Sequence, residues 1–204
     1  MNNIKKTALH QAAKDGHDKI VSALLGHFKD KSELKEFMKA QNSLNETALH
    51  LASEGGHDKV VSDLLGHFKN DLEMRDYIKT MEKNGWTALH FAAEKGHDKV
   101  VSDLLGHFKN DSELKEFIKA QNNFKETALH LVARWGHDKV LSDLLRHFRD
   151  DSELKEFIQT MNKCGHTALH LAVKRGHDNI VSALLVYFEN NSKLANFEKM
   201  MFAY

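Results

Sequence analysis

The chain has 204 residues, of which 41% are hydrophobic and 28% are charged, a composition that excludes an intrinsically disordered protein. Lysine plus arginine and aspartate plus glutamate each number 29, so the formal charge is zero and neither nucleic acid nor an anionic membrane is an expected partner. The lone Cys164 excludes an internal disulfide framework, and no apolar run resembles a signal peptide or a membrane span, so we expect a cytoplasmic protein.

A four-residue motif organises the chain. Thr7-Ala8-Leu9-His10 recurs unchanged at 47–50, 87–90, 127–130 and 167–170, always 40 residues later. A period of this length is typical of a solenoid, in which each repeat buries its apolar face by stacking on its neighbours. We therefore expect one elongated domain over residues 1–204, with repeats 1 to 5 at about residues 3–42, 43–82, 83–122, 123–162 and 163–204.

The first repeat predicts two antiparallel helices joined by a short turn. Thr7 can cap a helix over about Ala8 to Asp15, and Gly16, which recurs in every repeat, is the expected left-handed residue that ends it. Asp18 then lies in the first turn of a second helix, where a carboxylate is favourable. The apolar stripe of this helix has a 3.6-residue period and predicts core residues at Ile20, Val21, Leu24, Leu25 and Phe28.

Residues 30–41 predict a third amphipathic helix, and the same pattern returns in the later repeats. In repeat 2 the apolar residues Met74, Tyr77, Ile78 and Met81 follow the spacing i, i+3, i+4, i+7 of one helix face. The chain has no proline, so Gly, Asn and Asp must form the turns. We expect three helices per repeat.

The repeats resemble the ankyrin repeat. The residues that carry the resemblance are clearest in repeat 3, as Thr87-Ala88-Leu89-His90, then Gly96-His97, then a helix with paired Val and Leu residues, although Ala88 stands where the family has proline. The resemblance covers all five repeats. It implies an all-α solenoid that binds partner proteins in a groove formed by its loop tips and first helices.

Two departures from the family pattern change the expected fold. The period is 40 residues instead of about 33, because the third amphipathic segment takes the place of the usual loop. The glycine of the family's finger turn is present at Gly85 and Gly165 but is replaced by Lys5, Asn45 and Lys125 in the other repeats. We therefore expect loop tips with little or no regular β-hairpin.

The histidines and the single cysteine are side chains of this chain that could bind a metal ion or act as a nucleophile. Ten of the fifteen histidines belong to the repeated His10 and His17 positions, which the resemblance implies are structural. The ladder formed by His27, His67, His107 and His147 cannot share a zinc ion, because stacked helices stand about 8–10 Å apart and Zn–N bonds are about 2.0–2.1 Å long. Cys164 beside His166 could form a thiolate pair, but nothing else there indicates a nucleophile. We expect no catalytic residue, no metal and no cofactor.

Specificity should lie where the copies differ, which is in the loop before each Thr-Ala-Leu-His motif and at the end of each first helix. Charge changes along this series, from acidic near Glu46 to basic near Arg175, and tryptophans near its centre are typical interface anchors. Leu44 and Phe124 could instead turn inward to replace the absent glycine. The candidate partner-binding residues are Leu44, Glu46, Glu54, Trp86, Glu94, Lys95, Phe124, Glu126, Arg134, Trp135, His166, Lys174 and Arg175.

The sequence therefore predicts a non-enzymatic adaptor that binds a protein, as a monomer, through its loop tips and first helices. The alternative is a structural or self-associating solenoid that uses its apolar C-terminal end or its third-helix face. At that end, the apolar residues could either fold back to close the stack or form an exposed patch: Val186, Tyr187, Met200, Phe202 and Tyr204. The partner is not named by the sequence, and a complete protein and a fragment are equally compatible with it.

Overall fold

A computed structural model describes residues 6–68 and 70–189 of the chain. Every element in this part of the chain is a helix, and repeats 1 to 4 each contain three, as the 40-residue period predicts. The first helices are α1 (Ala8–Lys14), α4 (Ala48–Gly55), α7 (Ala88–Lys95), α10 (Ala128–Trp135) and α13 (Ala168–Arg175). The second helices are α2 (Asp18–Gly26), α5 (Asp58–Gly66), α8 (Asp98–Gly106), α11 (Asp138–Leu145) and α14 (Asp178–Glu189). The third helices are α3 (Lys31–Lys39), α6 (Asp71–Ile78), α9 (Asp111–Ile118) and α12 (Asp151–Ile158).

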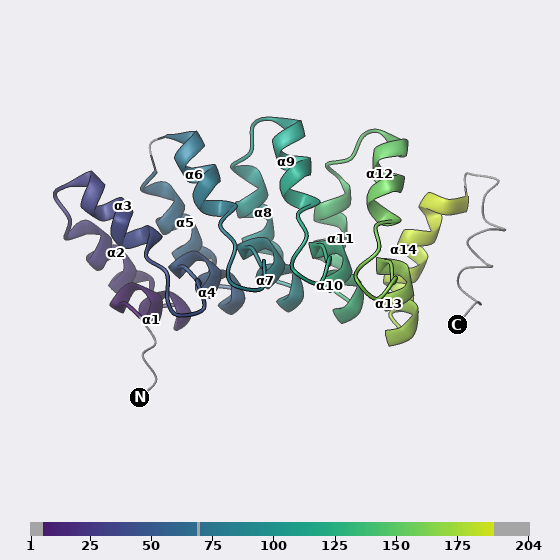
Figure 1. The fold of residues 1–204 in the computed structure, drawn as a ribbon, viewed down its shortest axis with the longest axis horizontal. Helices are drawn as coiled ribbons and strands as arrows, with labels where there is room; N and C mark the ends of the chain where they lie inside the picture. The colour runs from purple at the N-terminus through teal and green to yellow at the C-terminus, as the bar shows by residue number, and fades with distance from the viewer. Residues whose placement is uncertain (1–5, 69, 190–204) are drawn as a thin grey trace.

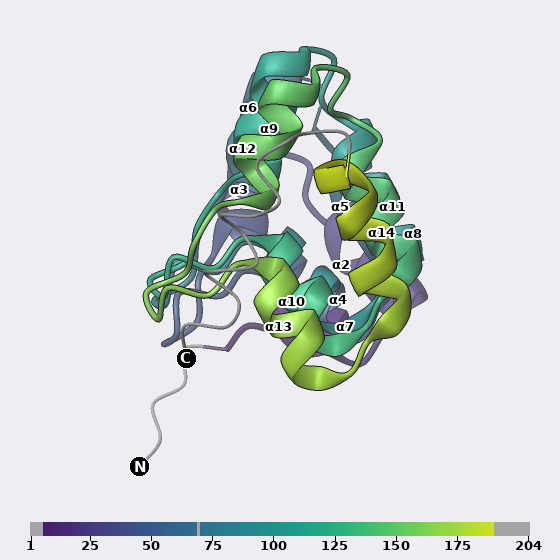
Figure 2. The same cartoon turned by 90° about the vertical axis from the view of Figure 1, so that its right-hand side faces the viewer.

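The helices stack in sequence order into an elongated solenoid (Figure 1). Seen along the stack, the first, second and third helices form three separate columns, and the loops that precede the first helices project together on one side (Figure 2). A hydrophobic core runs between the columns from Leu9 in α1 to Leu184 in α14. The three-helix repeat predicted from the third amphipathic segment is thus confirmed.

The Thr-Ala-Leu-His motif begins each first helix with a capping box between threonine and histidine. In repeat 2 the backbone N–H of Thr47 donates to Nδ1 of His50 at 3.1 Å. Nε2 of the same ring contacts the carbonyl oxygen of Thr80, just after α6 of the same repeat (3.0 Å), and that of Trp86 in the loop of the next repeat (3.2 Å). Because Nδ1 accepts, Nε2 must carry the proton, so the buried ring is neutral and joins two repeats.

A second histidine joins neighbouring repeats at the turn after the first helix. Gly96 ends α7 with φ +74, as the expected left-handed residue, and the ring of His137 from the next repeat lies directly against it. Nε2 of His137 donates to the carbonyl oxygen of Glu94 at 2.8 Å. Since a Cβ on Gly96 would overlap this ring, the glycine is required for both its backbone conformation and its small size.

The second and third helices meet through aromatic pairs. Phe108, which follows α8, stacks on Phe117 of α9 with ring centroids 4.9 Å apart, and Phe148 and Phe157 form the same pair in repeat 4. Ion pairs then link consecutive third helices, such as Arg75 to Glu113 at 3.1 Å. These contacts explain why the amphipathic segment forms a helix: its apolar face has an aromatic partner and its charged face has one in the next repeat.

The ends of the stack depart from the predicted core. Ile20 in α2 is 51% exposed, whereas Val60, its counterpart in repeat 2, is 1% exposed. The reason is that, among the second helices, α5 packs between α2 and α8, whereas α2 packs on α5 alone and has no described repeat on its other side. The expectation that Ile20 is a core residue is therefore wrong. Val186 is 57% exposed. The side chain of Tyr187 and all of Met200, Phe202 and Tyr204 lie outside the described residues, as does Lys5.

Within residues 6–68 and 70–189, no helix has the length and apolar character needed to cross a bilayer.

Candidate functional site

The loops before the first helices of repeats 2 to 5, residues 42–46, 82–86, 122–126 and 162–166, share one construction and are called finger loops below. In the first of them the N–H of Asn42 donates to the carbonyl oxygen of Glu46 at 3.0 Å. The N–H of Asn45 donates to the carbonyl oxygen of Asn42, also at 3.0 Å. The side chain of Asn42 accepts the N–H groups of Leu44 (2.8 Å) and Glu46 (3.0 Å). Each loop is thus a closed turn built on the side chain of its first residue.

Residues without glycine's freedom adopt the same turn. Asn45 and Lys125 have φ values of 63° and 55°, close to those of Gly85 (77°) and Gly165 (75°) at the same place in the other loops. The absence of glycine at Asn45 and Lys125 put a regular β-hairpin in doubt there, and the structure forms the turn at both places without strands. No strand is assigned in the described finger loops, as expected.

Neighbouring finger loops are joined edge to edge. The N–H of Lys83 donates to the carbonyl oxygen of Leu44 (3.0 Å), that of Asn123 to Asn84 (2.8 Å), and that of Lys163 to Phe124 (2.9 Å). Together with the buried histidines of the first helices, these bonds fix the spacing of the loops. The four finger loops therefore present their tips as one rigid row (Figure 2).

Two of the four loop tips carry large apolar side chains that are exposed to solvent. Leu44 is 51% exposed and Phe124 is 55% exposed, while Asn84 and Cys164 occupy the same tip position in the alternate loops. The alternative that Leu44 and Phe124 turn inward is therefore wrong. The backbone turn forms without them, so their side chains serve no packing need in the frame.

The two tryptophans differ in role. Trp86 is half-buried and its ring packs against Phe91 (centroids 5.1 Å apart) and His90 (6.0 Å) of α7. Trp135, at the end of α10, is 48% exposed, and the guanidinium of Arg175 lies 5.9 Å from its ring centroid. Trp135 is therefore the more accessible aromatic residue, and the cation–π contact with Arg175 orients it.

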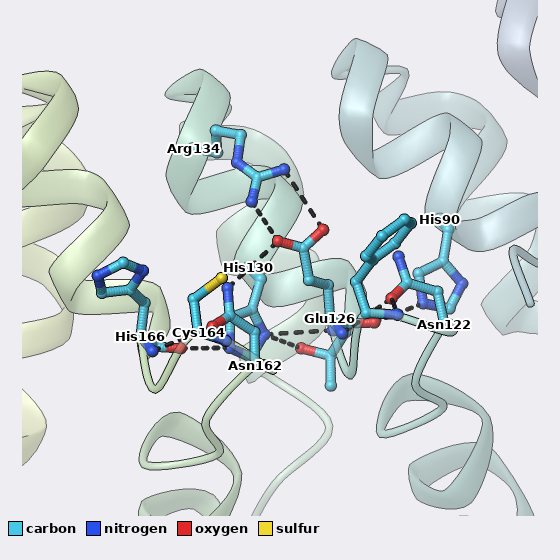
Figure 3. A network of polar contacts seen from close by, with 10 residues as sticks. His90, Asn122, Glu126, His130, Arg134, Asn162, Cys164 and His166 are labelled. Carbon is cyan, nitrogen blue, oxygen red and sulfur yellow. Dashed lines mark hydrogen bonds and ion pairs between the residues drawn. The ribbon is translucent and has the colours of Figure 1, made fainter. Parts of the chain in front are cut away.

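Glu126 and Arg134 form an internal network instead of a free charged surface (Figure 3). Glu126 is 5% exposed, and its carboxylate forms an ion pair with the guanidinium of Arg134. Nδ2 of Asn162 in the next finger loop donates to the same carboxylate at 3.3 Å. The sequence proposed both charges as partner contacts, whereas the structure uses them to join α10 to two finger loops.

The remaining charged candidates fall into paired and unpaired groups. Glu94 and Lys95 form an ion pair at 3.2 Å. Glu46 is half-buried, and Nδ2 of Asn42 donates to its carboxylate at 2.6 Å. Three others form no ion pair within the described chain, and they lie at the ends of first helices: Glu54, Lys174 and Arg175.

His166 contributes its backbone to the frame. Its N–H donates to Oδ1 of Asn162 at 3.0 Å, and its carbonyl oxygen contacts Nε2 of His130 at 3.2 Å. Cys164 is exposed, and its N–H is also held by Asn162 (2.9 Å). No group of three or more metal-ligating side chains occurs in the part of the chain that is described.

Sequence reasoning missed the residue that builds each finger loop. Asn42, Asn122 and Asn162 are buried and accept two N–H groups each, and Glu82 does the same in the loop of repeat 3. The signal was available, because asparagine recurs at this place in three of the four loops and forms such turns with its own side chain.

Comparison with known families agrees with this architecture. A family model described as ankyrin repeats (3 copies) matches residues 1–76, 30–116 and 107–194. The chain belongs to the ankyrin repeat family. No curated protein matches it. Ankyrin repeats are generally protein–protein interaction modules and typically non-enzymatic, so the family directs attention to a protein partner.

Proposed function

We propose that this ankyrin repeat protein is a non-enzymatic adaptor that binds a partner protein on the surface formed by its finger loops and the ends of its first helices. This surface is called the loop–helix surface below. The observation that carries the proposal is the exposure of Leu44 and Phe124, each more than half exposed, on tips that the backbone holds rigidly. Large apolar side chains that the fold does not need are typical of a binding site.

The rigidity of the finger loops supports tight binding. Association loses free energy whenever a loop or side chain must become ordered, at about 0.5–1.5 kcal/mol per side chain. Here the tips are already ordered by bonds such as Asn123 N–H to Asn84 O at 2.8 Å. A partner would therefore meet a preformed surface and would lose little free energy to loop ordering.

Trp135 extends the apolar surface from the finger loops to the first helices. Its ring is 48% exposed, and tryptophan is among the side chains that most often dominate binding energy. Trp86 packs on Phe91 and is better described as support for the surface than as its anchor. In this proposal the five repeats act as one domain and one monomer in the cytoplasm, without a cofactor.

The test is affinity capture from a cell lysate followed by mass spectrometry, comparing the wild type with a Leu44→Ser/Phe124→Ser/Trp135→Ser variant. All three positions are exposed, so the variant should keep its fold, which circular dichroism can verify. A matched control is Leu72→Ser, because Leu72 is equally exposed (57%) but lies on the third-helix column. The proposal predicts that proteins captured by the wild type and by the control are lost with the triple variant.

Equal capture by all three proteins would refute the loop–helix surface as the binding site. Loss of the captured proteins with Leu72→Ser alone would place binding on the third helices instead.

A second candidate function is self-association through the third-helix face. It is favoured by three exposed apolar side chains on or just after the third helices, Leu72 (57%), Met81 (45%) and Met161 (39%). Light scattering of the wild type and of Leu72→Ser over a wide concentration range tests it. A monomer at every concentration would exclude this function.

A further inference from the structure

One pair of positions, eight residues apart, recurs on the loop–helix surface of every repeat. The first position is the last residue of the finger loop, and the second lies near the end of the first helix. In repeat 4 these are Glu126 and Arg134, whose side chains meet in an ion pair (Figure 3). The fold therefore brings the two side chains of this pair within reach of each other. Their charges decide which charge a partner side chain must carry to bind at that repeat.

Repeat 2 places two acids at the same pair of positions, Glu46 and Glu54. Neither forms an ion pair within the described residues, although Lys83 lies on the adjoining finger loop. In repeat 4 the corresponding place beside the glutamate is filled by the guanidinium of Arg134. Repeat 2 thus has two carboxylates at the positions where repeat 4 has a carboxylate and a cation.

Repeat 5 places a histidine and a lysine at this pair, His166 and Lys174. The neighbouring Arg175 lies over Trp135, and Lys163 stands exposed on the finger loop. The described part of the chain contains no acidic side chain in an ion pair with Lys163, Lys174 or Arg175. This end of the surface therefore holds three exposed cations beside an exposed aromatic ring.

In repeats 1, 3 and 4 the acidic side chains at these positions have partners in their own repeat. In repeat 3 Glu94 is paired with Lys95 at 3.2 Å, and in repeat 4 Glu126 is paired with Arg134. In repeat 1 the pair is Lys6 and Lys14, but Gln11 links Lys6 to the acidic Asp15 through hydrogen bonds of 2.8 and 2.5 Å. Lys14 and Lys125 add single cations to repeats 1 and 4 that form no ion pair within the described residues. Across these positions repeat 2 is therefore the most acidic and repeat 5 the most basic.

We propose that the loop–helix surface binds an extended protein segment in one orientation, with a basic residue over repeat 2 and an acidic residue over repeat 5. The inference rests on the proposed function. The basic side chain takes, between Glu46 and Glu54, the place that Arg134 takes beside Glu126. The acidic side chain meets Lys174 and Arg175, and apolar residues between the two charges contact Phe124 and Trp135. Opposite charges at the two ends fix the direction of the segment.

The geometry also sets the spacing of the two charges. Repeats 2 and 5 are three repeats apart, which is about 24–30 Å at the usual 8–10 Å between packed helices. An extended chain rises about 3.3 Å per residue, so the basic and acidic residues of the segment should be about seven to nine positions apart.

Selection of random 16-residue peptides displayed on phage, with the purified full chain as target, tests the inference. The enriched peptides should carry Arg or Lys seven to nine positions from Asp or Glu, always in the same order. Selection on Glu46→Gln/Glu54→Gln should lose the basic residue and keep the acidic one, and Lys174→Gln/Arg175→Gln should do the reverse. In fluorescence anisotropy an enriched peptide should bind each of these variants at least tenfold more weakly than the wild type.

Controls separate this inference from the proposed function on which it rests. Glu36→Gln/Glu156→Gln removes two exposed charges from the third helices and should leave binding unchanged. Enriched peptides that depend on Leu44, Phe124 and Trp135 but show no such charge spacing would overturn the inference alone. Peptides that bind the Leu44→Ser/Phe124→Ser/Trp135→Ser variant equally well, or no enrichment at all, would overturn the proposed function and the inference together.

Discussion

The guanidinium of Arg134 in α10 forms an ion pair with the carboxylate of Glu126, a finger-loop residue that is only 5% exposed. Asn162 of the following loop also donates to this carboxylate, at 3.3 Å. In repeat 2 the corresponding Glu46 forms no ion pair within the described residues and accepts a hydrogen bond from Asn42 of its own loop instead. The Arg134–Glu126 pair thus ties one first helix to two finger loops and orders the surface proposed to bind the partner.

Removing Arg134 should destabilise the protein. Arg134→Met leaves the buried carboxylate of Glu126 without its cation, and since the pair is only partly shielded from water we expect a loss of about 2 kcal/mol in the free energy of unfolding. Urea denaturation measures it. The double variant Arg134→Met/Glu126→Gln should recover most of the loss, because no uncompensated charge remains. A loss below about 0.5 kcal/mol in the single variant would show that the pair contributes little.

Stability should fall in mild acid because of the buried histidines. Burial lowers the pKa of His50 and that of His90 from 6.5 to about 4, although backbone carbonyls oppose the change. The two rings therefore bind a proton more tightly in the unfolded chain than in the folded one. The stability that the neutral rings contribute is complete above about pH 6.5 and is lost as the pH falls toward 4. The loss should be about 3 kcal/mol for each histidine. Urea denaturation between pH 7.5 and 4.5 checks this, and a constant free energy of unfolding would contradict it.

Two glycines of the same repeat position should respond differently to alanine. Gly96 and Gly176 have φ values of +74° and +71°, so a Cβ strains both by about 1 kcal/mol. At Gly96 the added carbon would also displace the His137 ring, whereas at Gly176 no described residue other than the adjoining backbone lies within 4 Å of the corresponding point. The melting temperature should therefore fall clearly more for Gly96→Ala than for Gly176→Ala in thermal unfolding. Equal losses would mean that the histidine contact contributes nothing.

Lys125→Gly should stabilise the third of the four finger loops. Lys125 has a φ of 55°, a conformation that costs a side chain about 1 kcal/mol and costs glycine nothing. Its side chain is exposed and forms no ion pair within the described residues, so little is lost with it. We expect a gain of about 0.5–1 kcal/mol in the free energy of unfolding. Urea denaturation measures this change. Lys139→Gly, in a helix, is the control and should lower the free energy of unfolding by about 1 kcal/mol.

Local rules accounted for the elements of this fold, because each repeat carries its own signals. Thr7 begins a capped helix, Gly16 ends it in the left-handed region, and the spacing of Met74, Tyr77 and Ile78 identified the third helix. Such signals act within one or two helical turns, so a sequence displays them directly. Ile20 was misjudged because its burial depends on a neighbouring repeat.

The candidate site was less predictable, because its residues act across elements. Glu126 in the finger loop and Arg134 eight residues later form an ion pair. A spacing of eight residues across a loop and a helix does not predict such a contact. Similarly, Asn45 and Lys125 are ordinary in sequence, and only the turn built on Asn42 and Asn122 explains their positive φ values. Variation between copies located the surface, whereas the division into paired and unpaired charges required the structure.

Hydrogen–deuterium exchange of the full chain, with and without a captured partner or selected peptide, tests most directly whether the loop–helix surface is the binding site. The account predicts slower exchange on binding in the finger loops at residues 42–46, 82–86, 122–126 and 162–166 and at the ends of α10 and α13, with no change in α6, α9 and α12. Protection confined to α6, α9 and α12, with the finger loops unchanged, would contradict it.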